Sequence, residues 1–219
     1  RRDVAALVED GLLMRFHGGV ALPSLPQEPS FGQRMATNEE AKRAIARRAA
    51  LEVANGDSVM LDTGSTTAYV GRALADHRDL LVVTNCVDIA RTLATRNGNR
   101  VYMAGGELRA DDGAALGPSA TAFIAQFRVR LAILSVGAIN DAFELMDYDL
   151  AEAEFSRVVM DRAERVIVVA DGSKFGQQGL VRVADLDAID LLITDAPPPP
   201  DFAAHLAASN VEVAVAAAG

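Results

Sequence analysis

Short apolar segments alternate with amphipathic segments along most of the chain. Predicted strands lie at residues 59–61, 80–84, 101–104, 131–136, 166–170, 191–194 and, more weakly, 211–215. Predicted helices fall between them, at residues 67–75, 87–94, 119–127, 152–162 and 202–208. Strands that are apolar throughout and alternate with helices indicate an α/β fold with a parallel sheet covered on both faces. Ligands of such folds bind outside the carboxyl ends of the strands.

The first 22 residues follow a different pattern. Val4 and Leu7 recur at helical spacing, Gly11 can end a helix in the left-handed conformation, and a short apolar run then meets a Gly-Gly turn at Gly19. This order predicts the tail of a DNA-recognition helix followed by a wing. The chain is therefore expected to begin inside a truncated winged helix-turn-helix module, although an ordinary helix and hairpin would show the same pattern.

Residues 23–37 are predicted to link two folded units. This segment holds several prolines among small and polar residues, which is the composition of a linker. Thr37, followed three residues later by Glu40, predicts a capping box at the start of the next helix. An effector-sensing domain is then expected over residues 38–219.

Composition narrows the classes of function. The chain has 219 residues, half of them hydrophobic, which is enough for one large domain and a fragment of another. A single cysteine, Cys86, excludes an internal disulfide and suits a reducing cytoplasm. No apolar run approaches the roughly 20 residues that a membrane helix needs.

The net charge of −9 means that any DNA contact must be local. One basic cluster lies in the first 22 residues, near the predicted wing. A second is expected to be a solvated helix face and comprises Arg34, Lys42, Arg43, Arg47 and Arg48.

Polar and glycine-rich motifs follow the predicted strands. Asp62 leads into residues 63–67, where backbone N–H groups, hydroxyls and the positive end of a helix dipole form an anion site. Phosphate is the expected guest, although a simple helix cap uses the same residue types. Lys174, in the loop after the fifth strand, can complete the neutralisation of a phosphate. Glu152, at a helix start, can accept hydrogen bonds from sugar or polyol hydroxyls.

The convergence of these motifs on one edge of one sheet predicts an effector site. The predicted effector-binding residues are Asp62, Gly64, Ser65, Thr66, Thr67, Thr84, Asn85, Gly105, Gly106, Glu107, Gly137, Glu152 and Lys174. Paired glycines in this set let the backbone approach a ligand closely. Each residue also has an ordinary alternative, as a turn residue, a tight loop or a surface charge.

Two groups of motifs resemble the DeoR-type bacterial transcriptional regulators. The first comprises Arg1-Arg2-Asp3, Gly11-Leu12-Leu13 and His17-Gly18-Gly19. The second comprises residues 61–67, 83–85, 104–109 and 171–176, in the order that the family shows. The resemblance thus extends over almost the whole chain.

This resemblance implies a DNA-binding repressor that assembles as a homodimer or homotetramer. Its sensor domain would have the fold of ribose-5-phosphate isomerase and glucosamine-6-phosphate deaminase, and would bind a phosphorylated sugar or polyol as effector. Operator DNA would be contacted by the N-terminal module through Arg1, Arg2, Arg15 and His17.

Further stretches resemble the subgroup of this family that senses glycerol 3-phosphate. They comprise Gly117 and residues 105–109, 123–128, 147–148 and 194–199. The resemblance implies glycerol 3-phosphate as an inducer that releases the protein from DNA. One departure is Asn140, where the family commonly carries aspartate. In the related isomerases an acidic residue in that loop supports catalysis, so Asn140 weakens an enzymatic interpretation and can alter how ligand hydroxyls are read.

An isomerase or deaminase on the same scaffold is the main alternative. Acid–base candidates exist in Asp62, Glu107, Glu152 and Lys174. A pure oligomerisation domain with a relict pocket is a third interpretation. The three histidines lie far apart in the sequence, and neither a nucleotide-binding loop nor a dinucleotide fingerprint occurs. The sequence therefore predicts a regulator with no catalytic residues, no metal and no cofactor.

Overall fold

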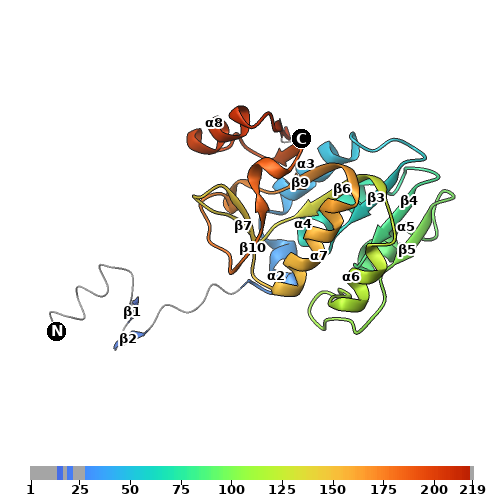
Figure 1. The fold of residues 1–219 in the computed structure, drawn as a ribbon, viewed down its shortest axis with the longest axis horizontal. Coiled ribbons are helices and arrows are strands. Elements are labelled where there is room, and N and C mark those ends of the chain that lie inside the picture. The colour runs from blue at the N-terminus through green and yellow to red at the C-terminus, as the bar shows by residue number, and fades with distance from the viewer. Residues whose placement is uncertain (1–13, 17–18, 22–27, 218–219) are drawn as a thin grey trace.

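The main sheet has seven strands, all parallel (Figure 1). The computed structural model describes residues 14–16, 19–21 and 28–217. In chain order the strands are β3 (Ser58–Leu61), β4 (Leu81–Thr84), β5 (Arg100–Met103), β6 (Val129–Ser135), β9 (Ala163–Val169), β11 (Leu191–Thr194) and β12 (Glu212–Val215). Their order across the sheet is β12-β11-β9-β6-β3-β4-β5. The predicted parallel α/β fold is thereby confirmed.

Helices cover both faces of this sheet, as Figure 1 shows. One face carries α3 (Glu39–Ala50), α4 (Ser65–Ala73) and α5 (Val87–Leu93). The other face carries α6 (Pro118–Ile124), α7 (Leu150–Asp161) and α8 (Pro200–Ala208). Successive side chains of a strand point to opposite faces, so each buried strand supplies both cores. Met60 thus packs on the α7 side, and its neighbours Val59 and Leu61 pack on the α4 side.

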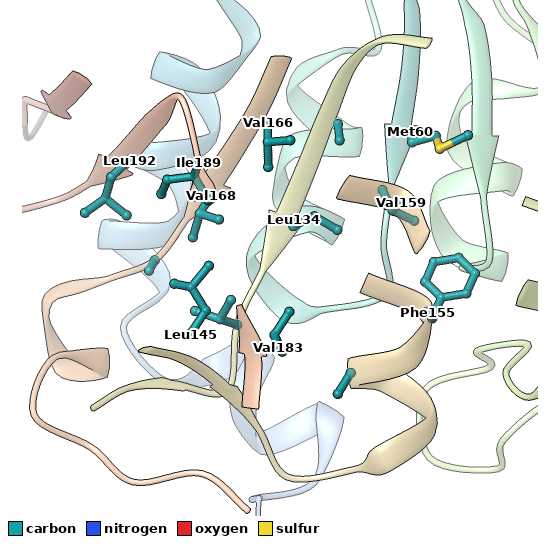
Figure 2. Close-up of a cluster of buried hydrophobic side chains, with 14 of the residues drawn as sticks. Met60, Leu134, Leu145, Phe155, Val159, Val166, Val168, Val183, Ile189 and Leu192 are labelled. Atoms are coloured by element: carbon teal, nitrogen blue, oxygen red, sulfur yellow. The ribbon is translucent and has the colours of Figure 1, made fainter. Parts of the chain in front are cut away.

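The core under α7 holds the sheet and that helix together. Figure 2 shows Met60, Leu134 and Val166 from the strands in one cluster with Phe155 and Val159 from α7. Phe155 is 2% exposed. Burying an apolar side chain of this size contributes about 1.5–3 kcal/mol to folding. This packing fixes the helix whose first turn carries Glu152.

A second, antiparallel sheet was not predicted from the sequence. Its strands, in the order β10-β8-β7, are β7 (Ala138–Ile139), β8 (Glu144–Asp147) and β10 (Val181–Asp185). Leu145 and Val183 join it to the core under α7 (Figure 2). Such short strands, one with a register shift, show no clear alternation of apolar and polar residues in the sequence. The small sheet matters because it brings Asp147 to the edge of the main sheet.

A helix that the sequence did not predict, α2 (Phe31–Ala36), lies inside the predicted linker. Its capping box is formed by Ser30 and Gln33. The Thr37 hydroxyl donates to the Gln33 carbonyl at 2.9 Å, so Thr37 ends α2. The residue that starts α3 is Asn38, with φ of 53° and no side-chain cap bond. The capping box predicted at Thr37 is therefore wrong, because that hydroxyl serves the preceding helix.

Partly buried hydrogen bonds attach α2 to the sensor domain. The Phe31 N–H donates to Asp111 Oδ2 at 2.7 Å, and the Tyr69 hydroxyl donates to the Met35 carbonyl at 3.1 Å. Lys42 is 4% exposed and donates to the carbonyls of Arg34 and Thr37. The expectation that Lys42 belongs to a solvated basic face is wrong, since its ammonium closes the end of α2. The chain from Phe31 onward packs as part of the domain.

The N-terminal segment contains one described hairpin. Strands β1 (Met14–Phe16) and β2 (Gly19–Ala21) pair antiparallel, as the predicted wing requires. Arg15 lies in β1, whereas Arg1, Arg2 and His17 fall outside the described residues. Among the helices that the structure describes, none is long and apolar enough to cross a bilayer.

Candidate functional site

The strand order identifies one crevice. The first strand of the main sheet, β3, lies in its interior, with β4 and β5 on one side and β6, β9, β11 and β12 on the other. The chain winds in opposite directions from β3, so the connections after β3 and β6 diverge and leave a crevice at their carboxyl ends. The Ser135 N–H at the end of β6 donates to Asp62 Oδ2 at 3.0 Å, directly after β3. The predicted motifs therefore flank the topological switch point.

The start of α4 presents unpaired backbone donors to this crevice. The first helical hydrogen bond runs from the Ala68 N–H to the Gly64 carbonyl at 2.9 Å. The N–H groups of residues 65–67 therefore have no acceptor within the helix. The N-cap residue, Gly64, makes no side-chain cap bond, and a Cβ there would collide with the Ser135 hydroxyl. Glycine thus allows α4 to begin directly against β6, with its positive end at the crevice.

Two buried acceptors deeper in the crevice lack partners. Asp62 is 4% exposed, and its Oδ1 has no hydrogen-bond partner among the described residues. Asn85 is fully buried; its Nδ2 donates to the Ala115 carbonyl at 3.1 Å, while its Oδ1 is likewise unpaired. Both residues line one inner cavity together with Glu152 and Phe155, and this cavity is closed to a volume of about 0 Å³ by the surrounding side chains. Buried acceptors are normally satisfied, so this pair indicates a place for hydroxyl donors of a ligand.

Acidic side chains line the same crevice as the start of α4. Glu152 is 8% exposed in the first turn of α7, and Asp147 is 5% exposed at the end of β8. Burial raises the pKa of Glu152 and of Asp147, and their mutual repulsion adds to the rise for Glu152. Burial also raises the pKa of Asp62 well above its usual range. Arg109 forms ion pairs with Asp112 and Glu152 and partly balances this charge.

Cations enter the crevice from two other segments. Lys174, in the 3-10 turn after β9, donates from Nζ to the Gly137 carbonyl at 3.1 Å. Arg34 of α2 pairs through Nη1 with Glu28 Oε1 at 2.8 Å, and the two side chains are 12% and 17% exposed. Burial raises the pKa of Glu28, while Arg34 and then Lys174 oppose that rise.

These groups enclose a small outer cavity of about 20 Å³. Its lining residues are Glu28, Arg34, Thr63, Ser65, Thr66, Ser135, Val136, Gly137, Asp147, Glu152 and Lys174. A wider groove of about 760 Å³ runs along the first turns of α3 and includes residues 171–173 of the loop after β9, next to Lys174 of the crevice. Exposed charged side chains line much of that groove, so we assign the site to the crevice.

Most of the predicted effector-binding residues lie at the crevice. Those on the cavity walls are Asp62, Ser65, Thr66, Asn85, Gly137, Glu152 and Lys174. Gly64, Thr67 and Thr84 lie beneath them in local bonds: the Thr67 hydroxyl donates to the Gly64 carbonyl, and the Thr84 hydroxyl accepts from the Cys86 N–H.

Three predicted residues lie away from the cavities. Gly105, Gly106 and Glu107 are exposed and line neither cavity. From the same loop it is Arg109 that reaches the site, through its ion pair with Glu152. Asn140 also lies elsewhere, because its Oδ1 accepts from the N–H groups of Ala142 and Glu144 in the β7–β8 turn.

The sequence missed several residues that line or border the cavities, namely Glu28, Arg34, Arg109, Asp112, Ser135 and Asp147. For Ser135 and Asp147 a signal existed, since each ends a strand. Glu28 and Arg34 gave none, because their position depends on the packing of α2.

Comparison with known proteins adds a family match. A family model described as the DeoR C terminal sensor domain matches residues 37–196. The glycerol-3-phosphate regulon repressor of Escherichia coli (strain K12) is 38% identical over 199 residues, which are 91% of this chain and 79% of that protein. The HTH-type transcriptional repressor CsqR of the same strain is 34% identical over 213 residues, with coverage of 97% and 82%.

Solved structures match at low sequence identity. A chain of the tetrameric eIF2B-beta2-delta2 complex from C. thermophilum aligns with a TM-score of 0.53 at 15% identity, covering 78% of this chain and 60% of that one. Ribose 5-phosphate isomerase A from Methanocaldococcus jannaschii aligns with a TM-score of 0.46 at 18% identity, covering 64% and 55%. The first likeness concerns the fold alone.

Proposed function

The chain belongs to the DeoR family of transcriptional regulators, and on that premise we propose that its sensor domain binds glycerol 3-phosphate as an inducer. The relatives are named as transcriptional repressors, and this protein is a regulator of the same kind rather than a sugar-phosphate isomerase or deaminase. The inducer relieves repression of a carbon-utilisation operon by lowering the affinity of the protein for operator DNA.

The phosphate group binds at the start of α4. The unpaired N–H groups of residues 65–67, the hydroxyls of Ser65 and Thr66 and the helix dipole supply donors and positive potential. Lys174, which lines the same cavity, adds a cationic side chain. A phosphate can accept from all of these groups at once, because it offers several acceptor oxygens.

The polyol hydroxyls bind deeper, and the observation that carries the proposal lies there. Asp62 Oδ1 and Asn85 Oδ1 are buried acceptors without a partner among the described residues, and they line the same inner cavity. Leaving a buried acceptor unpaired costs about 1–3 kcal/mol, and a ligand hydroxyl at each would remove that cost. Glu152, on the same cavity wall, can accept from a further hydroxyl.

The output is assigned to the N-terminal module. We assign the β1–β2 hairpin as the wing of a winged helix-turn-helix module. Arg1, Arg2, Arg15 and His17 contact operator DNA. A homodimer or homotetramer presents paired modules to the two halves of an operator. The linker ends before α2, because α2 packs on the sensor domain.

Calorimetric titration tests the effector assignment. The protein is titrated with glycerol 3-phosphate, fructose 1-phosphate, fructose 6-phosphate and unphosphorylated glycerol. We expect saturable binding of glycerol 3-phosphate and far weaker binding of glycerol. Binding of a hexose phosphate alone would keep the sensor and discard the three-carbon effector. Silence from all four ligands would contradict the proposed site.

A further inference from the structure

A side chain from outside the sheet fills part of the proposed phosphate site. Glu28, just before α2, pairs with Arg34 at 2.8 Å and lines the outer cavity with Thr66 and Lys174. Its side chain is only 17% exposed. A carboxylate therefore already lies among the cations and donors that a phosphate would use.

The remaining space is too small for a ligand. The outer cavity has a volume of about 20 Å³. About one water molecule fits in such a space, whereas small-molecule sites typically measure about 300–1,000 Å³. A three-carbon phosphate can enter only if one of the lining side chains leaves.

Glu28 is the lining group that can leave at the smallest structural cost. Ser65, Thr66, Ser135, Asp147 and Glu152 belong to strands and helices of the main fold. By contrast, Glu28 lies outside any helix or strand and has one ion pair, and the residues that follow it, 29–30, are exposed.

Electrostatics act on Glu28 in two opposing ways. Arg34 and Lys174 attract its carboxylate, whereas Asp147 and Glu152 line the same cavity and repel it. A phosphate that arrives while Glu28 stays would add a further negative charge to this cluster. Expelling Glu28 exchanges one anion for another, so the cluster gains less negative charge than it would with both anions present.

We infer that the Glu28 carboxylate is a tethered competitor of the effector: the phosphate group takes over Arg34 and Lys174 and expels Glu28 from the outer cavity. The inference rests on the proposed phosphate site, and it adds Arg34 to the phosphate-binding residues. Glu28 follows the predicted DNA-binding module by only a few residues in the sequence. Its expulsion therefore links effector binding to the segment that leads to the DNA-binding module. The link works because the effector binds one arrangement of that segment more tightly than the other.

The competition has a measurable size. A tethered group acts at an effective concentration of roughly millimolar. The apparent affinity of a ligand falls by the fraction of molecules in which its site is vacant. If Glu28 occupies the cavity in about nine molecules of ten, removing its charge should tighten effector binding about tenfold.

The test compares wild type with Glu28→Gln by calorimetry, using glycerol 3-phosphate and inorganic phosphate as probes. Glu154→Gln is the matched control, since it makes the same change on an exposed face of α7. We expect Glu28→Gln to bind both probes about tenfold more tightly and the control to match wild type. Equal or weaker binding by Glu28→Gln, while wild type binds, would overturn the inference and leave the proposed phosphate site intact. Failure of every variant to bind either probe would overturn both.

Hydrogen–deuterium exchange gives a second readout on wild-type protein. On addition of glycerol 3-phosphate, amides at residues 65–68 should exchange more slowly because the phosphate covers them. Amides of residues 30–34 should exchange faster, since α2 loses the ion pair between Glu28 and Arg34 of its last turn. Slower exchange in both segments would mean that Glu28 stays in place, and would overturn the inference.

Discussion

The inner and outer parts of the crevice are built differently. The inner part holds Asp62 and Asn85 directly after two strands and Glu152 on a helix, and one oxygen of Asp62 and one of Asn85 have no partner among the described residues. The outer part holds Glu28, Arg34 and Lys174, which come from segments beyond the main sheet and are already engaged with other protein groups. The acceptors of the inner part are thus held in position by the main fold, although space for a ligand must still open beside them. In the outer part a ligand must in addition replace existing contacts.

This contrast explains how one site can both recognise an effector and change conformation when the effector binds. A region held in position by the main fold gives specificity because its unpaired acceptors reject any ligand without matching hydroxyls. A region held by replaceable ion pairs allows a conformational response, since only contacts that differ between two states can shift their balance. The two demands are met by different segments of the chain.

The largest expected effect is on the stability of the inner part. Phe155 is 2% exposed, lines the inner cavity and fixes α7 on the sheet. Phe155→Ala should lower the free energy of unfolding by about 3–5 kcal/mol, through lost burial and the cavity left behind. Urea denaturation followed by circular dichroism measures this. The control is Phe123→Ala on α6, which is only partly buried and should cost less. Equal losses of unfolding free energy in the two variants would mean that Phe155 fixes α7 on the sheet no more firmly than a partly buried side chain does.

The next effect concerns charge in the outer part. Lys174→Ala should weaken binding of glycerol 3-phosphate by about 2–3 kcal/mol, roughly a hundredfold, because a charged hydrogen-bond donor to the phosphate is lost. Unphosphorylated glycerol should bind as it does to wild type. Arg91→Ala is the control, since that side chain is 80% exposed on α5. An equal loss for both ligands would assign Lys174 to the structure of the loop and not to the phosphate.

The inner part was easier to predict than the outer part, for a physical reason. Asp62 and Asn85 directly follow apolar strands, and the carboxyl ends of neighbouring parallel strands meet at one edge. Local pattern therefore determines where these two residues lie. Glu28 and Arg34 reach the site only through tertiary contacts of a short helix in a proline-containing segment. No periodicity in the sequence reports such contacts.

Two differences between the structure and the sequence interpretation have the same origin. Thr37 lies between two helices and could serve either; the structure uses it to end α2. In the loop after β5 the sequence favoured Glu107, whereas the loop folds back through a bridge between Leu108 and Ala115 and brings Arg109 beside Asp112. In both places the choice between near neighbours depends on contacts with residues distant from the motif itself.

The third expected effect is a change of stability with pH. It tests the repulsion among the carboxyl groups that lie where the inner and outer parts of the crevice meet. Burial raises the pKa of Asp147 to about 6, above its value of about 3.9 in an unfolded chain. The proton is thus held better by the folded state, and the resulting stability is fully present below pH about 4 and is lost as the pH rises through about 6. Asp147→Asn stays neutral and should raise the free energy of unfolding at pH 8 by on the order of 2 kcal/mol.

Thermal unfolding at pH 4 and pH 8 checks this prediction. Asp147→Asn and wild type should melt at similar temperatures at pH 4 and diverge at pH 8. Asp161→Asn is the control, since its carboxyl is 71% exposed at the end of α7. If Asp147→Asn were less stable than wild type at pH 8, the wild-type Asp147 carboxylate would be a stabilising partner of Arg109 or Lys174. Repulsion among the buried carboxyl groups would then not destabilise the folded state.

The smallest effect separates hydroxyl from backbone donors at the start of α4. Thr66 is 4% exposed and lines the outer cavity, whereas the hydroxyl of Thr67 is already bonded to the Gly64 carbonyl at 3.1 Å. Thr66→Val keeps shape and amide but removes one donor, so glycerol 3-phosphate should bind about 1 kcal/mol more weakly, roughly fivefold. Thr92→Val makes the same change on α5, where the hydroxyl bonds to the Asp88 carbonyl, and should leave binding unaltered. If Thr66→Val bound as wild type does, the backbone N–H groups of α4 would hold the phosphate without the hydroxyl, and recognition in the outer part would rest on helix geometry and cations alone.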